Sequence, residues 1–165
     1  MPISDIYTAH FTPTIATTSA TAAGSLISPA TKRAWVVGVR VKILQTTAAS
    51  GNNVLFQLAR PQNTPNASSL STVADAHDFS APASLSSIAS TWTTPPTVST
   101  AAGGILAEYN LPQVAGAMWE EFPPSGYEWQ VPAIANNSAN SGVHVFITQN
   151  VSTSTTYAID LIFSE

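Results

Sequence analysis

One short segment of this chain combines the residue types that metal binding or general-base chemistry uses. Asp75, His77 and Asp78 lie within four consecutive positions. Carboxylates and an imidazole are ligands for divalent metals. However, the spacing matches no closed metal site, and Asp in a loop commonly bonds to its own backbone. We therefore interpret residues 75–78 as a solvated turn.

A second acidic cluster raises the possibility of a glycosidase, because those enzymes use a pair of carboxylates. Glu120 and Glu121 are adjacent, and Glu128 follows nearby. Adjacent residues in a strand point to opposite faces of a sheet. Glu120 and Glu121 are therefore not expected to act as a catalytic pair.

Other signatures of catalysis are missing from the sequence. There is no nucleophile elbow, phosphate-binding loop or zinc-binding helix motif, and Gly103-Gly104 is typical of a turn. A cupin-like metalloenzyme would need two or three histidines and a glutamate on facing strands. The three histidines here are scattered, and His10 and His144 fit ordinary strand positions. We predict no catalytic, cofactor-binding or metal-binding residue, and no enzymatic activity.

Five aromatic residues form the remaining candidate site: Tyr109, Trp119, Tyr127, Trp129 and Trp92. Such rings could form a platform on which sugars stack. Aromatic side chains more commonly anchor cores and interfaces. We favour packing as their role.

The composition argues against several partners. Ser, Thr and Ala supply 20, 20 and 25 of the 165 residues, charged residues make up 8%, and cysteine is absent. The net charge of −4 argues against nucleic acid and anionic membrane as partners. No apolar run approaches the length of a membrane span, and residues 1–5 do not resemble the start of a secretory signal.

The charges are divided unevenly along the chain. Five basic residues and one acid give the first 60 residues a charge of +4, and eight acids give the rest −8. Complementary patches of this kind can orient docking between subunits. Alternatively, strands of opposite charge pair within one fold, which is the interpretation we prefer.

Alternating apolar residues predict strands in two parts of the chain. Residues 33–45 place Trp35, Val37, Val39, Val41 and Ile43 on one face. After a Gly/Asn turn, residues 54–60 predict a returning strand with Val54, Phe56 and Leu58 inward, so the two should form a hairpin. Residues 143–149 and 156–163 predict a second hairpin, with the following residues inward in its last strand: Tyr157, Ile159, Leu161 and Phe163.

The remaining segments complete the expected architecture. Residues 105–110, 119–122 and 127–131 predict short strands, and no amphipathic helix of ten residues is present. Residues 1–24 are expected to form an arm or edge strand, and residues 61–104 a long Pro/Ser/Thr-rich loop excursion. We predict a single all-β domain over residues 1–165, an antiparallel β-sandwich of jelly-roll type.

The two ends of the chain also resemble a known family. The opening part is a Thr/Ala-rich lead followed by residues 27–41, a Gly/Asn turn and residues 54–60. The closing part comprises residues 126–132, 143–146 and 159–163. This order resembles the small jelly-roll structural proteins of tailed bacteriophages, particularly capsid decoration (cement) proteins. The resemblance covers about two thirds of the chain and leaves the middle excursion unexplained.

The resemblance implies a non-enzymatic virion protein without a cofactor. Such a protein binds the major capsid protein on the outer surface of an icosahedral head, bridges neighbouring subunits, and often forms trimers. A homo-oligomer, favoured as a trimer, is therefore expected. The alternative is a tail-fibre or receptor-binding β-sandwich module that recognises host glycans through its Trp and Tyr residues.

Overall fold

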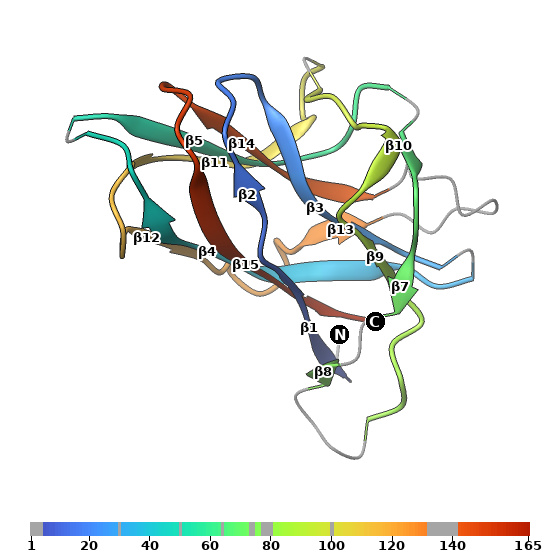
Figure 1. Cartoon of the computed structure of the whole chain (residues 1–165). Helices are drawn as coiled ribbons and strands as arrows, with labels where there is room; N and C mark the ends of the chain where they lie inside the picture. The colour runs from blue at the N-terminus through green and yellow to red at the C-terminus, as the bar shows by residue number, and fades with distance from the viewer. Residues whose placement is uncertain are drawn as a thin grey trace.

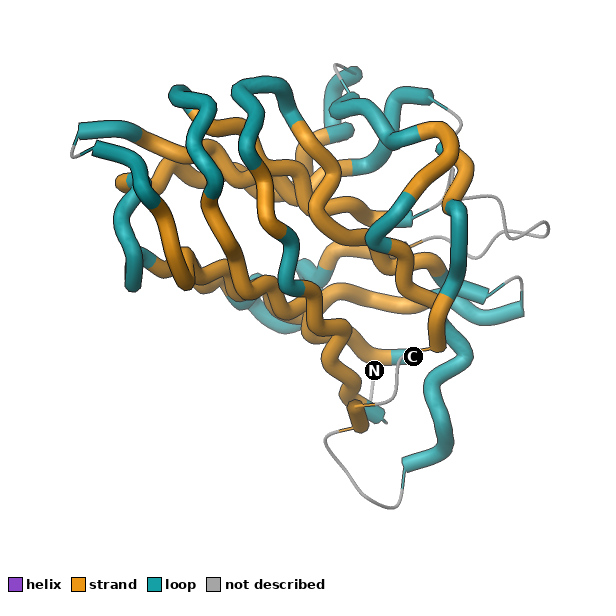
Figure 2. Tube along the Cα trace, in the orientation of Figure 1, coloured by secondary structure: helices purple, strands orange, loops and turns teal. Residues whose placement is uncertain are grey.

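The chain is described by a computed structural model that covers residues 5–29, 31–49, 51–63, 65–72, 75–76, 81–99, 101–131 and 142–165. Across these ranges the protein is all-β, with antiparallel sheets (Figure 1). Strands and loops alternate along the described trace, which contains no helix (Figure 2). It follows that the described residues include no helix suited to crossing a membrane.

The first of two large sheets has seven strands. Its main path is β12 (Met118–Glu121), β4 (Ala34–Thr46), β15 (Thr155–Ser164), β1 (Ile6–Phe11) and β8 (Asp75–Ala76). Off this path, β13 (Trp129–Val131) pairs with β4, and β2 (Thr14–Ile15) pairs with β15. The long central strands β4 and β15 therefore hold this sheet together.

The second large sheet has six strands. Its order is β11 (Ile105–Pro112), β5 (Asn53–Ala59), β14 (Val143–Gln149), β3 (Thr21–Ile27), β9 (Ser87–Ala89) and β7 (Ser71–Thr72). A separate two-stranded ribbon joins β10 (Trp92–Thr94) to β6 (Asn66–Ala67). The two large sheets form separate layers, as in a β-sandwich (Figure 1).

The pairing of the strands corrects both predicted hairpins. β4 lies in the seven-stranded sheet and β5 in the six-stranded sheet, although they are consecutive in sequence. β14 and β15 are separated in the same way. Each connection therefore crosses between the layers. The turn residues that suggested a hairpin belong to these crossing connections. The alternation of apolar and polar residues predicts which face of a strand is buried, but it does not identify the neighbouring strand.

The predicted inward faces of three strands are confirmed. Apolar residues at alternate positions of β4, β5 and β15 are fully buried, and they form one core between the sheets. These residues are Val39, Val41, Ile43, Val54, Phe56, Leu58, Tyr157, Ile159, Leu161 and Phe163, each 0% exposed.

The first part of β4 departs from the prediction. Trp35 and Val37, predicted to face inward, are only half-buried, whereas Val36 is fully buried. Consecutive residues of β15 lie opposite Gly38 and then Val36, so Val37 has no partner across the ladder. Val37 is thus the extra residue of a β-bulge, which moves the alternation by one position.

Residues 1–24, predicted as an arm or edge strand, contribute β1, β2 and the start of β3 to the two sheets. β1 pairs with β15 along its whole length. Tyr7 and Phe11 are buried, and the ring of Tyr7 stacks on Phe163 with 5.5 Å between centroids. This segment therefore contributes side chains to the core.

The described part of residues 61–104 contains five short strands, β6 to β10. Trp92 and Val98 from this region pack against Ala22, Ala59 and Phe146. Phe146 lies between core residues of β14 and therefore points away from the core. Trp92 and Val98 thus cover part of the outer face of the six-stranded sheet.

A buried polar network ties the loops at one end of the molecule. The side-chain amide of Gln113 donates to Gln149 and to the hydroxyl of Thr155, both at 3.0 Å. The amide of Gln149 donates to the carbonyl of Ile15 at 2.9 Å. Because a buried amide is costly without hydrogen bonds, this network fixes the β11–β12 connection against β14, β15 and β2.

Candidate interaction surfaces

A row of charged side chains crosses the outer face of the seven-stranded sheet. Nε and Nη2 of Arg40 donate to Glu120 at 3.0 and 2.5 Å, and Nη1 of Arg40 lies 3.9 Å from Asp160. Nδ1 of His10 lies 2.6 Å from Asp160, and Nε2 of His10 is 3.1 Å from the hydroxyl of Thr12. We call Glu120, Arg40, Asp160 and His10 the charge row.

The strand register explains this row. Glu120 and Asp160 both lie opposite Arg40, and His10 lies opposite Asp160. The hydrogen bond from Arg40 to Glu120, together with the charge of Glu120, raises the pKa of Arg40. Exposed ion pairs contribute only about 0–1 kcal/mol to stability. The row therefore contributes little to holding the sheet together.

Apolar side chains flank the charge row on the same face. Leu44, Met118 and Phe122 are 45%, 50% and 52% exposed. The ring of Phe122 occupies the space where a side chain on Gly38 would stand, so glycine allows the ring to approach β4 closely. Exposed apolar groups gathered beside polar ones are typical of interaction sites.

The outer face of the six-stranded sheet contains a serine–histidine pair. The hydroxyl of Ser25 and Nδ1 of His144 are hydrogen bonded at 2.5 Å, and both residues are 0% exposed. The two residues lie opposite each other on β3 and β14. A nucleophilic serine must reach its substrate, so this buried pair is best understood as a structural hydrogen bond between strands.

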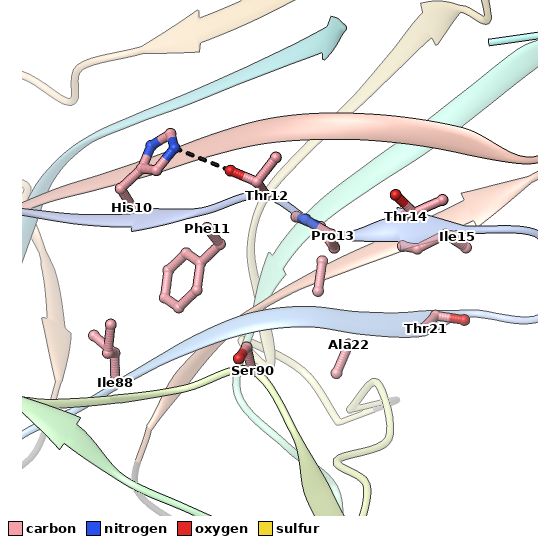
Figure 3. A pocket seen from close by; sticks show the side chains of 11 residues that line it. His10, Phe11, Thr12, Pro13, Thr14, Ile15, Thr21, Ala22, Ile88 and Ser90 are labelled. Atoms are coloured by element: carbon pink, nitrogen blue, oxygen red, sulfur yellow. Dashed lines mark hydrogen bonds between the residues drawn. The ribbon is translucent and has the colours of Figure 1, made fainter. Parts of the chain in front are cut away.

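A hollow of about 460 Å³ lies along β1 and β2 on one side and β3 on the other. Figure 3 shows Phe11 directed into the space towards Ile88 and Ser90, whereas His10 and Thr12 point away from it. Ile15 and Ala22 add apolar surface. Its lining contains one imidazole and no carboxylate, so it offers shape and hydroxyl groups but little acid–base chemistry.

The predicted acidic sites are separated or lie outside the described residues. His77 and Asp78 are among the latter, and Asp75 is described only by its backbone pairing with Thr8. In the ranges that the structure covers, no three His, Asp or Glu residues are grouped so as to hold a metal ion.

Glu120 and Glu121 face opposite sides of the sheet, as predicted. Glu120 lies beside Arg40, and Glu121 lies opposite the inward-facing Val39. Both carboxylate oxygens of Glu128 accept the backbone N–H of Gly126 at 2.9 Å, which lowers the pKa of Glu128. These three carboxylates therefore do not converge on one site.

The five aromatic residues have different surroundings. Trp119 is 6% exposed, and its ring stacks on Tyr109 with 5.9 Å between centroids and 6° between planes. Trp92 and Trp129 also pack against buried residues. Tyr109 and Tyr127 remain exposed, at 47% and 76%. The three tryptophans therefore contribute to packing, and tyrosines supply the accessible rings.

The charge row was missed from the sequence, since its members are separated by as many as 150 positions. The only signal was the excess of basic residues before position 60 and of acids after it. We preferred the interpretation that the opposite charges pair within one fold. Arg40 pairs in this way with Glu120 and Asp160. Comparison with protein-family models and with curated proteins found no match to this chain.

Proposed function

We propose that the chain is a single domain of jelly-roll topology. The strand order carries this proposal. The sheets contain the rows β12-β4-β15-β1 and β11-β5-β14-β3, in which strands from the start and the end of the chain lie side by side. Eight strands distributed in this way over two sheets are typical of a jelly roll, an architecture common among viral capsid proteins and lectins.

On this basis we propose a non-enzymatic virion protein that decorates the exterior of a tailed-phage capsid and bridges major-capsid subunits. The support is an analogy of fold, together with the resemblance of both chain ends to decoration proteins. The composition agrees with a contact role, because Ser, Thr and Ala lose little side-chain entropy on burial. Weak contacts repeated over a lattice gain strength through avidity.

We place the capsid contact on the described part of residues 61–104, at the edge of the six-stranded sheet that β9 and β7 form. This region exposes two large apolar side chains, Leu70 and Leu85, at 39% and 58%. Leu70 directly precedes β7 and Leu85 lies two residues before β9, both strands of the six-stranded sheet, whereas the charge row lies on the seven-stranded sheet. The protein would then bind the head through one layer of the sandwich and present the other.

The test uses phage particles from the source of this chain. Antibody against the chain should label the heads of intact particles, and the protein should bind again to heads from which it has been stripped. Leu70→Ser with Leu85→Ser should weaken that binding. The control, Ile105→Ser with Val114→Ser, changes residues of similar exposure, 40% and 41%, and should not. Absence of the chain from purified particles, or label only on tails, would contradict the proposal.

A glycan-binding tail module is the second candidate. The observation that favours it is the exposed ring of Tyr109, held flat by its stack on Trp119. Held rings of this kind can stack on sugars at low entropic cost. A glycan array separates the candidates: a saccharide preference that Tyr109→Ala removes would support the tail module, whereas a decoration protein should show none.

A further inference from the structure

Charged side chains alternate in sign across three neighbouring strands, and an imidazole follows on the fourth. Glu120 on β12 is negative, Arg40 on β4 is positive, and Asp160 on β15 is negative. His10 on β1 follows, with its Nδ1 2.6 Å from Asp160. The pattern thus reads negative, positive, negative across the sheet, with an imidazole beside the last carboxylate.

We propose that a second copy of this chain binds this face about a two-fold axis parallel to the strands. An axis midway between β4 and β15 brings β4 of one copy over β15 of the other, and β12 over β1. Arg40 then meets Asp160 of the second copy, and Glu120 meets His10. A two-fold axis across the strands would instead bring each charge onto its own kind. Such like-charge contacts are unfavourable, so the row selects one arrangement.

The apolar residues on this face fit the same arrangement. The large exposed side chains Leu44, Met118 and Phe122 belong to β4 and to β12 with its continuation. On the same face, β15 carries Ala158 opposite the exposed Lys42 and the half-buried Ile162 opposite Gly38, and Thr8 of β1 lies opposite Ile162. The two-fold axis therefore places Gly38 of one copy over Ile162 of the other, and Lys42 over the small Ala158.

The size of the face predicts a weak dimer. Four strands spaced about 4.8 Å apart, over seven residues of about 3.3 Å each, give about 440 Å² per copy. The total of about 900 Å² lies below the usual range of stable interfaces. We therefore expect a weak dimer whose population depends on protein concentration. The proposal concerns the isolated protein and stands whether or not the chain decorates a capsid.

A charge swap tests this geometry directly. Arg40→Glu places like charges opposite Asp160 in both contacts of a homodimer, and Asp160→Arg does the same opposite Arg40. Each variant alone should dimerise about tenfold or more weakly than the unaltered chain. Mixed together, the two variants regain opposite charges at both contacts and should form a heterodimer of near-original affinity. Sedimentation over about 1–500 μM protein measures all three cases.

Several results would overturn the proposal. These are wild-type dimerisation by either single variant, a mixture that stays monomeric, trimers in place of dimers, or an unaltered chain that stays monomeric throughout. Circular dichroism and thermal unfolding establish that each variant is folded. As a second measurement, Met118→Asp should also abolish dimerisation. Its control, Ile105→Asp, changes an exposed residue on the six-stranded sheet and should have no effect.

Discussion

Glu165 connects the end of β15 to the segment that precedes β9. Its carboxylate accepts hydrogen bonds from the hydroxyl of Ser84 at 2.5 Å and from the backbone N–H groups of Leu85 and Ser86 at 3.0 and 2.8 Å. The residue is 8% exposed. Nearby, the hydroxyl of Tyr7 donates to the carbonyl of Pro82 at 2.8 Å. We therefore expect Glu165→Gln to release residues 81–86 from the sandwich.

The size of the effect follows from these contacts. A hydrogen bond to a charged group contributes about 1.5–3 kcal/mol. Glutamine keeps the shape of the side chain, but its single amide oxygen cannot replace a carboxylate with three donors. Glu165→Gln should therefore lower the free energy of unfolding at pH 7 by about 2–3 kcal/mol, or the melting temperature by about 5–10 °C.

The same contacts predict how stability depends on pH. Burial raises the pKa of Glu165, but the hydrogen bonds from Ser84, Leu85 and Ser86 outweigh it, so the folded-state pKa is lowered. Such a carboxylate stabilises the fold at pH values above its pKa in the unfolded chain, about 4.3. This stabilisation is lost as the pH falls through its pKa in the folded chain. The unaltered chain should thus lose more stability below pH 5 than Glu165→Gln does.

Urea unfolding at a series of pH values between about 7 and 3 measures both effects. The control is Glu121→Gln, which changes a half-buried carboxylate and should alter stability by less than about 0.5 kcal/mol. If Glu165→Gln matches the unaltered chain at pH 7 and shows the same slope with pH, the hydrogen-bonded carboxylate does not hold this segment.

Three further experiments test the packing and the buried polar network. Gly24→Ala places a carbon 2.6 Å from the ring of Phe11 and should lower the free energy of unfolding by about 1–3 kcal/mol. In a double-mutant cycle, Phe11→Ala should relieve that loss, whereas additive effects would refute the contact. Gln113→Leu removes a donor to a buried amide oxygen and should cost about 1–3 kcal/mol in urea unfolding, and a neutral result would show that the network is dispensable. Trp119→Ala should cost about 3–5 kcal/mol and Tyr109→Ala about 1 kcal/mol, since only the tryptophan is buried; equal losses would argue against this assignment.

The sequence by itself predicted the class of fold and the inner faces of its main strands. Alternation over Val54 to Leu58 and over Tyr157 to Phe163 identified side chains that are fully buried. This worked because the side chains of a strand alternate with a period of two, whatever the neighbouring strand is. The small share of charged residues, 8%, is a property of the composition and needs no coordinates.

The neighbours of each strand were decided only by the tertiary structure. The turns after β4 and β14 were expected to close hairpins. In both places, however, the chain crosses to the opposite sheet. The bulge at Val37 is equally invisible in the sequence, because it depends on how β4 pairs with β15.

The charge row shows the consequence for function. His10 and Asp160 lie 2.6 Å apart although 150 positions separate them, and Arg40 reaches Glu120 over 80 positions. Each residue type could be read from the sequence, but their order across the sheet comes from long-range strand pairing. Local periodicity carries no information about such pairing, since the core that selects it is assembled from both ends of the chain.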